Sequence, residues 1–138
     1  MSKFKLRITG DLGFEVWEDI EGYEGLYQVS TYGRIKSLER ELFNGRGYYT
    51  ATEKIKTPSL HKNYLQIKLY RDNTYIIDRV HRIVADTFIP NPLNYPCINH
   101  KDEKTINNHV ENLEWCTWLY NNNYGTRKER VKKLNIYV

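Results

Sequence analysis

The 138-residue sequence predicts an α+β fold, in which an antiparallel β module precedes a smaller unit built as strand, loop, strand and helix. Three observations support this prediction. Strand signals bounded by turn residues dominate the chain up to about residue 80. The apolar period becomes that of a helix at Val80. Beyond Pro92, a polar segment lies between two short apolar runs, which is typical of a hairpin with a long loop.

The first half contains four strand signals, which are, in order, "LYQVS", "GRIKSL", "YLQIKLY" and "YIIDRV". A turn at Gly33 separates the first two, and "RDNT" separates the last two. In the third signal, Leu65, Ile67 and Leu69 alternate with polar residues and tyrosines. We therefore expect these three residues to face the core and Lys68 to lie on the opposite, open face.

A helix is expected next, because Val80, Ile83, Val84 and Phe88 fall on one side of a helical wheel. It should end before Pro90, since proline cannot continue a helix. The expected hairpin strands are residues 97–98 and 110–116.

Thr117 is expected to cap a second helix through "WLYNNNY", which ends at Gly125. Asn121 would lie about one turn into this helix, with its side chain directed back across the hairpin. Thr126 and Glu129 have the spacing of a capping box, which predicts a further short basic helix.

Charge is distributed unevenly. Lys and Arg number 21 against 17 Asp and Glu, and residues 15–24 carry acids without a base. Basic residues follow, interleaved with tyrosines, and suggest a surface that binds double-stranded DNA. On residue types alone, a solvated surface over core tyrosines is equally supported. The candidate DNA-binding residues are Arg34, Lys36, Arg40, Arg46, Lys54, Lys56, Lys68, Arg127, Lys128 and Arg130.

Other classes of protein find little support. Cys97 and Cys116 form no CxxC pair, so the sequence predicts neither a four-cysteine zinc site nor a disulfide scaffold. The pair together with His100 and His109 fits no common zinc finger, so we expect the cysteines to pack in the core. The start of the chain has no apolar run of signal-peptide length and no stretch of membrane-span length, so we expect a cytoplasmic protein without membrane contact.

Three segments resemble the HNH homing endonucleases, whose catalytic unit is the ββα-metal (His-Me) finger. These segments are "VHRIVADTFIPNP" (80–92), "INHKDEKTINN" (98–108) and "VENLEWCTWLYNNN" (110–123). Residues 15–38 resemble the N-terminal module fused to phage and intron-encoded members. The resemblance implies a DNA-contacting β module at residues 1–57. It also implies a nuclease domain at 58–138, with a ββα core at about 96–124 and a basic C-terminal helix.

The same resemblance assigns roles to four residues. His100 matches the general base, which takes a proton from the water that attacks phosphorus. Asn112 matches the asparagine that ties the hairpin loop together and helps orient the base. Asn99 and Asn121 match the positions that hold one divalent metal ion, Mg²⁺ or alternatively Mn²⁺. A backbone or side-chain oxygen would have to hold the second ring nitrogen of His100.

The chain departs from the family pattern at two places. Asn99 stands where many members have Asp, which should weaken metal binding until DNA phosphates complete the site. Glu103 stands where members often have a turn glycine. Asp102 is expected to form the turn rather than to replace a ligand. Of the other histidines, we expect His81 to be structural and hydrogen-bonded, and His109 to face out of the loop.

The predicted function is that of a metal-dependent DNA endonuclease which nicks or cuts double-stranded DNA in a bacterial or phage-infected cell. We expect a monomer, with a homodimer as the alternative. The alternative function is a catalytically weak or inactive HNH-fold regulator of phage or prophage origin. That alternative rests on the missing carboxylate at Asn99 and on a chain that ends fifteen residues after Asn123.

Overall fold

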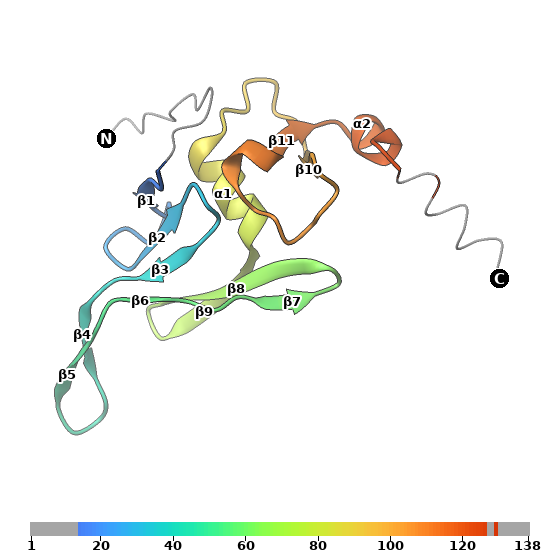
Figure 1. The fold of residues 1–138 in the computed structure, drawn as a ribbon. Coiled ribbons are helices and arrows are strands. Elements are labelled where there is room, and N and C mark those ends of the chain that lie inside the picture. The colour runs from blue at the N-terminus through green and yellow to red at the C-terminus, as the bar shows by residue number, and fades with distance from the viewer. Residues whose placement is uncertain (1–13, 127–128, 130–138) are drawn as a thin grey trace, which may run out of the picture.

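The computed structural model describes residues 14–126 and Glu129. Its N-terminal part is a four-stranded antiparallel sheet with the order β1-β2-β3-β6 (Figure 1). A two-stranded hairpin is inserted between β3 and β6 and projects away from the body of the molecule. The sheet strands are β1 (Trp17–Asp19), β2 (Tyr27–Ser30), β3 (Ile35–Ser37) and β6 (Lys54–Ile55), and the hairpin strands are β4 (Arg40–Phe43) and β5 (Tyr48–Ala51).

A second, three-stranded sheet follows, with β8 (Tyr64–Arg71) between β7 (Ser59–His61) and β9 (Thr74–Arg79). The predicted alternation holds in β8, because Ile67 and Leu69 are buried while Lys68 is exposed. The β8–β9 turn is closed by Asp72 and Asn73, which both have positive φ, at 53° and 60°. This is the geometry in which a two-residue hairpin turn matches the twist of its strands.

Helix α1 (Val80–Phe88) runs through the centre of the fold (Figure 1). It begins and ends where the sequence predicts, with Ile89 already extended before Pro90. Its buried residues are Val80, His81, Ile83, Val84, Ala85 and Phe88. The apolar ones join residues of β2, β3, β8 and the C-terminal hairpin in a single hydrophobic core. Residues on both sides of position 57 thus share one core, and a domain division there stays a prediction.

The C-terminal unit has the predicted order of strand, loop, strand and helix. Strands β10 (Cys97–His100) and β11 (Leu113–Cys116) pair antiparallel, with Asn99 opposite Glu114. The second apolar run differs from the expectation, because its first three residues form the short 3₁₀ helix η1 (Val110–Asn112). The reason is local: the His109 side chain accepts a hydrogen bond from the Glu111 amide and so caps this turn.

Helix α2 (Trp118–Asn123) begins at the predicted cap, where the Thr117 hydroxyl accepts a bond of 3.1 Å from the Tyr120 amide. It ends before Gly125, whose φ is +55°. The predicted basic helix from Thr126 falls almost wholly outside the described residues. Within the part of the chain that the structure describes, no helix is long and apolar enough to cross a membrane.

Candidate active site

A small hollow at the end of β10 brings together three of the four residues assigned to the site. Asn99 and His100 line it from β10, and Asn121 lines it from α2. Consecutive strand residues point to opposite faces, yet Asn99 and His100, the last two residues of β10, both line this hollow. The other lining residues are Tyr64, Ile98, Glu103, Thr105 and Tyr124.

His100 is buried and held in one orientation. Its Nε2 lies 2.9 Å from Oδ1 of Asn108, and its ring lies beside those of His81 and Tyr64. Since an amide oxygen only accepts, Nε2 carries the proton and Nδ1 is left as the basic nitrogen of the neutral ring. Burial lowers the pKa of His100 from its ordinary value, an effect only partly offset by the Asn108 bond and by Asp102. A neutral imidazole is the form that a general base requires.

Asn108 is a site residue that the sequence analysis missed. The sequence predicted the need for an oxygen beside His100 but not the residue that supplies it. The turn between β2 and β3 holds this residue in place. The carbonyl of Thr31 accepts a 2.8 Å bond from the Val110 amide, and a Cβ on Gly33 would lie 2.7 Å from the Asn108 carbonyl oxygen. The N-terminal sheet therefore packs directly on the residue that orients His100.

The sequence predicted that His109 faces out of the loop, but its side chain makes two contacts within the protein. Its ring stacks on that of Tyr32 with a centroid distance of 4.9 Å, and its Nδ1 caps η1. His109 thus belongs to the contact between the β2–β3 turn and the hairpin loop. This contact could not be predicted from the residues around His109, because Tyr32 lies far away in the chain.

Asn112 lies outside the hollow and ties the loop together. Its Oδ1 accepts from the Asp102 amide at 2.9 Å, and its Nδ2 donates to Oδ1 of Asp102 and to the carbonyl of Asn107, each at 2.8 Å. Any effect of Asn112 on His100 must pass through this loop. Asp102 also accepts from the Lys104 amide. Hydrogen bonds, that from Asn107 foremost, hold the pKa of Asp102 below its ordinary value, in keeping with a turn-forming carboxylate.

The four residues of "NLEW" (112–115) each make a distinct contact. Besides Asn112, Leu113 is buried in the core, and the indole nitrogen of Trp115 donates to the Ile89 carbonyl at 3.0 Å. Glu114 accepts from Nδ2 of Asn99 at 2.9 Å and from the Tyr120 hydroxyl at 2.9 Å. Glu114 is a second residue of the site region that was not predicted.

The donors in the hollow suit a hard divalent ion. The amide oxygens of Asn99 and Asn121 are the ligand type that Mg²⁺ and Mn²⁺ accept, and neither is a soft ligand suited to zinc. Among the described residues, no group of three or more His, Cys, Asp and Glu is placed to hold a metal. An ion bound at this place would therefore need further oxygen ligands, which the phosphates of DNA provide.

Glu103 closes the hollow on the loop side. Its φ is +62°, so this position does adopt the left-handed conformation for which glycine is usual. Its carboxylate accepts from both the amide and the hydroxyl of Thr126 at 2.8 Å, which ties the loop to the segment after α2. The hydroxyl of Tyr124 adds a bond to the Lys101 carbonyl.

His81, Cys97 and Cys116 are structural residues. His81 is buried, but its Nδ1 has no hydrogen-bond partner among the described residues, contrary to the expectation of a hydrogen-bonded histidine. Burial lowers the pKa of His81 to about 3, so this ring is neutral near pH 7. Cys97 and Cys116 are free, buried and opposite each other in the β10–β11 pair. Burial raises the pKa of Cys116 to about 11.

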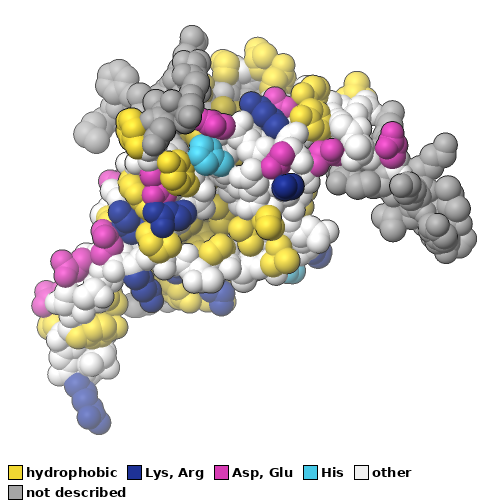
Figure 2. Space-filling model, viewed as in Figure 1, with side chains coloured by type: hydrophobic (Ala, Val, Ile, Leu, Met, Phe, Trp, Pro, Cys, Tyr) yellow, Lys and Arg dark blue, Asp and Glu magenta, His cyan; other side chains and the backbone are white. Residues whose placement is uncertain are grey.

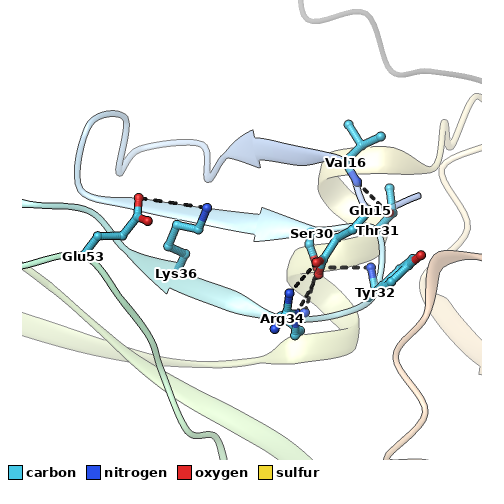
Figure 3. Close-up of polar contacts among 8 residues, drawn as sticks. All are labelled: Glu15, Val16, Ser30, Thr31, Tyr32, Arg34, Lys36 and Glu53. Atoms are coloured by element: carbon cyan, nitrogen blue, oxygen red, sulfur yellow. Dashed lines mark hydrogen bonds and ion pairs between the residues drawn. The ribbon is translucent and has the colours of Figure 1, made fainter.

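Several of the candidate DNA-binding residues already contact protein groups (Figure 3). Arg34 pairs with Glu15 through two hydrogen bonds, and Lys36 lies 4.0 Å from a carboxylate oxygen of Glu53. Arg40 donates to the Tyr27 hydroxyl at 3.1 Å.

Other members of the set lie more openly. In Figure 2, basic side chains are spread over the visible face of the molecule, and one lies at the end of the projecting hairpin. Arg46, Lys54 and Lys68 are exposed, and the nitrogen of Lys56 lies above the ring of Tyr70. Arg127, Lys128 and Arg130 lie outside the described residues.

Comparison with known proteins places this arrangement in a family. Residues 15–70 match the NUMOD4 motif, and this match runs across position 57. The chain is 32% identical over 115 residues to an uncharacterized HNH endonuclease of Acanthamoeba polyphaga mimivirus, covering 80% of this chain and 31% of that protein. It is 34% identical over 105 residues to the DNA endonuclease I-HmuI of Bacillus phage SP01, covering 76% of this chain and 54% of that protein.

A solved structure, described as DNA binding and cleavage by the HNH homing endonuclease I-HmuI, matches with a TM-score of 0.62 and 27% identity. The match covers 88% of this chain and 68% of that one. The chain thus spans roughly a third to a half of the length of these curated relatives. Together, the ordered sequence matches and the shared fold support the HNH homing endonuclease family for this chain.

Proposed function

We propose that the chain is a metal-dependent DNA endonuclease that hydrolyses phosphodiester bonds, nicking or cutting double-stranded DNA. The observation that supports this most strongly is the convergence of His100, Asn99 and Asn121 on one hollow. The names of the relatives point the same way, since they are HNH and DNA endonucleases.

Each protein group has a physical role in the proposed reaction. Nδ1 of His100 takes the proton of the attacking water while Asn108 holds the protonated Nε2. The amide oxygens of Asn99 and Asn121 would hold the divalent ion, Mg²⁺ or Mn²⁺. When bound, such an ion stabilises the charge that develops on the phosphate and on the departing 3′ oxygen. The products are a 5′ phosphate and a 3′ hydroxyl.

The DNA partner is held by the exposed basic residues. Arg46 lies in the turn of the projecting β4–β5 hairpin, and Lys68 lies on the open face of β8. A two-stranded ribbon of this kind is narrow enough to enter the major groove. Contacts by these residues to phosphates would position the duplex over the hollow without reading its sequence.

A plasmid-nicking assay with Mg²⁺, Mn²⁺ or EDTA tests this proposal. We expect conversion of supercoiled to open-circular plasmid that needs a divalent ion and is lost in His100→Ala. His61→Ala is the matched control, because His61 is an exposed histidine on β7, and it should nick at the wild-type rate. Nicking that survives in His100→Ala, or that persists in EDTA, would refute the proposal.

The second candidate is a DNA-binding regulator with the same fold and no catalysis. One observation favours it: Asn99 is an amide, and its nitrogen is engaged by Glu114. The same assay separates the two candidates when it is paired with a gel-shift measurement. Binding of duplex DNA without nicking under any divalent ion would favour the regulator.

A further inference from the structure

An asparagine in a metal site presents a problem that an aspartate does not. The two ends of a carboxylate are equivalent oxygens, whereas an amide offers one oxygen and one nitrogen that cannot bind a cation. Asn99 can serve as a ligand only when its oxygen faces the hollow. Some neighbouring group must therefore decide between the two orientations of the amide.

Glu114 is placed to make this choice. It lies directly opposite Asn99 in the β10–β11 pair, and its Oε1 is 2.9 Å from Nδ2 of Asn99. An ionised carboxylate only accepts hydrogen bonds, so the amide end that faces it must be the NH₂ group. Oδ1 branches from the same carbon in the other direction. Asn99 lines the hollow and Glu114 does not, so the carboxylate lies behind the amide rather than in the site.

The same carboxylate oxygen also bonds to helix α2. Oε1 of Glu114 accepts a 2.9 Å bond from the hydroxyl of Tyr120, the residue directly before Asn121. One oxygen atom thus joins β10, which carries Asn99, to α2, which carries Asn121. Hydrogen bonds of this charge-assisted kind are stronger than neutral ones and hold their partners more firmly.

We infer that Glu114 is a positioning residue, which fixes the Asn99 amide with its oxygen toward the metal and ties the two ligand-bearing elements together. This inference rests on the proposed function, because it presupposes a metal ion between Asn99 and Asn121. It accounts for how an amide serves at a place where many family members have a carboxylate.

The test is a cycle of substitutions in which the readout is metal binding rather than cleavage. Mn²⁺ alone is titrated into the full chain, and free Mn²⁺ is measured by electron paramagnetic resonance. Glu114→Ala should raise the Mn²⁺ concentration for half-saturation about tenfold, the lower end of the effect of removing a partner of a metal ligand. Glu111→Ala removes a carboxylate of the same hairpin that does not bond to Asn99, and it should shift binding less than twofold, roughly, as a remote surface charge does.

The decisive comparison repeats Glu114→Ala in the Asn99→Asp background. An aspartate presents oxygen at both ends, so it needs no orienting group, and the loss of Glu114 should no longer weaken Mn²⁺ binding. If Glu114 acted only through its negative charge, its removal would weaken binding in both backgrounds. An equal weakening in the two backgrounds would therefore overturn the inference.

Two further measurements keep the outcome clear. Glu114→Asp keeps the charge but withdraws the carboxylate by one methylene, and it should weaken Mn²⁺ binding nearly as much as Glu114→Ala. Side-chain amide signals in ¹⁵N NMR report the Asn99–Glu114 bond without metal, and they should shift in Glu114→Ala. If wild-type protein binds no Mn²⁺, either alone or with a nuclease-resistant duplex that supplies phosphate oxygens, the metal site and this inference both fail. If it binds Mn²⁺ but Glu114→Ala has no effect, only this inference fails.

Discussion

At the scale of single residues, His100, the proposed general base, depends on a neighbour that its own motif does not reveal. The sequence predicts His100 and the need for an oxygen beside it. The structure assigns that oxygen to Asn108, eight positions away in a loop of several polar residues. Asparagines 107, 108 and 112 look alike in the sequence, and only the folded loop separates the one that touches His100 from those that bond to Asp102.

We predict that Asn108→Ala lowers kcat for nicking by about 10-fold to 100-fold and leaves KM nearly unchanged, because it frees the His100 ring without removing a DNA contact. Steady-state nicking rates at several DNA concentrations measure this split. Asn107→Ala is the control, since Asn107 bonds to Asp102 and not to His100. Equal losses of kcat in both variants would show that the loop, and not the bond to His100, is responsible.

His81 links acid stability to the core. Burial lowers its pKa to about 3, whereas a histidine in an unfolded chain titrates near 6.5. Between these values the unfolded chain binds a proton that the folded chain does not. The contribution of His81 to folding stability is therefore complete above about pH 6.5 and is lost as the pH falls.

We predict that the free energy of unfolding falls on acidification below pH 6.5, with His81 contributing up to about 1.4 kcal/mol per pH unit. Urea titrations between about pH 7 and pH 4 measure the slope. His81→Phe keeps a ring against Tyr64 and should make the slope shallower. His61→Phe, at an exposed position, should leave it unchanged, and a wild-type slope in His81→Phe would contradict the assignment.

At the scale of elements, the sequence predicted what local pattern determines. The period of two in β8, the bounds of α1 and the Thr117 cap of α2 all depend on residues within a few positions of each other, and all are confirmed. The 3₁₀ turn at Val110–Asn112 was missed, because a short apolar run is compatible with either a strand or a tight turn. The His109 cap decides between them.

The contact between the β2–β3 turn and residues 107–110 could not be predicted, because it joins segments far apart in the chain. It depends on Gly33, where the absence of a side chain lets the turn approach Asn108. Gly25 offers a natural comparison. Its φ of +77° is close to the +81° of Gly33, but a Cβ there would meet open space.

We predict that Gly25→Ala costs about 1 kcal/mol of stability, from left-handed strain alone. Gly33→Ala should cost about 1–3 kcal/mol more, because its Cβ must push the Asn108 backbone aside. Thermal unfolding measures both. At a temperature where each variant is folded, Gly33→Ala should also nick more slowly than Gly25→Ala. Equal rates and equal stabilities would mean that the turn does not support the site.

At the scale of the whole molecule, one core holds the N-terminal sheet, α1 and the β10–β11 hairpin together. Residues within the NUMOD4 match contribute to the surroundings of His100, through Tyr64 in the hollow and Gly33 beside Asn108. The site is assembled by the fold as a whole. The sequence therefore predicted its polar residues but not the residues that pack against them and hold them in place.

The exposed charge of the molecule should govern how it binds duplex DNA. Neutralising a phosphate releases bound counterions, so the logarithm of the binding constant falls linearly with the logarithm of salt, by roughly 0.9 per phosphate contact. A cation already paired with a carboxylate releases fewer counterions from DNA, because the carboxylate largely neutralises its charge. By this reasoning, Arg34, which is bonded to Glu15, should contribute less than Arg46 and Lys68.

We predict that Arg46→Ala and Lys68→Ala each reduce the salt slope by about 1, while Arg34→Ala reduces it by clearly less than 1. Fluorescence anisotropy of a labelled duplex between about 50 and 200 mM salt measures the slope, with EDTA present to prevent cleavage. Glu15→Gln supplies the converse test. It removes the charged partner of Arg34, so the binding constant should fall more steeply with salt than in the wild type. If Arg34→Ala reduces the salt slope as much as Arg46→Ala does, the Arg34–Glu15 pair must open when DNA binds. The basic residues that contact DNA could then not be read from the free protein alone.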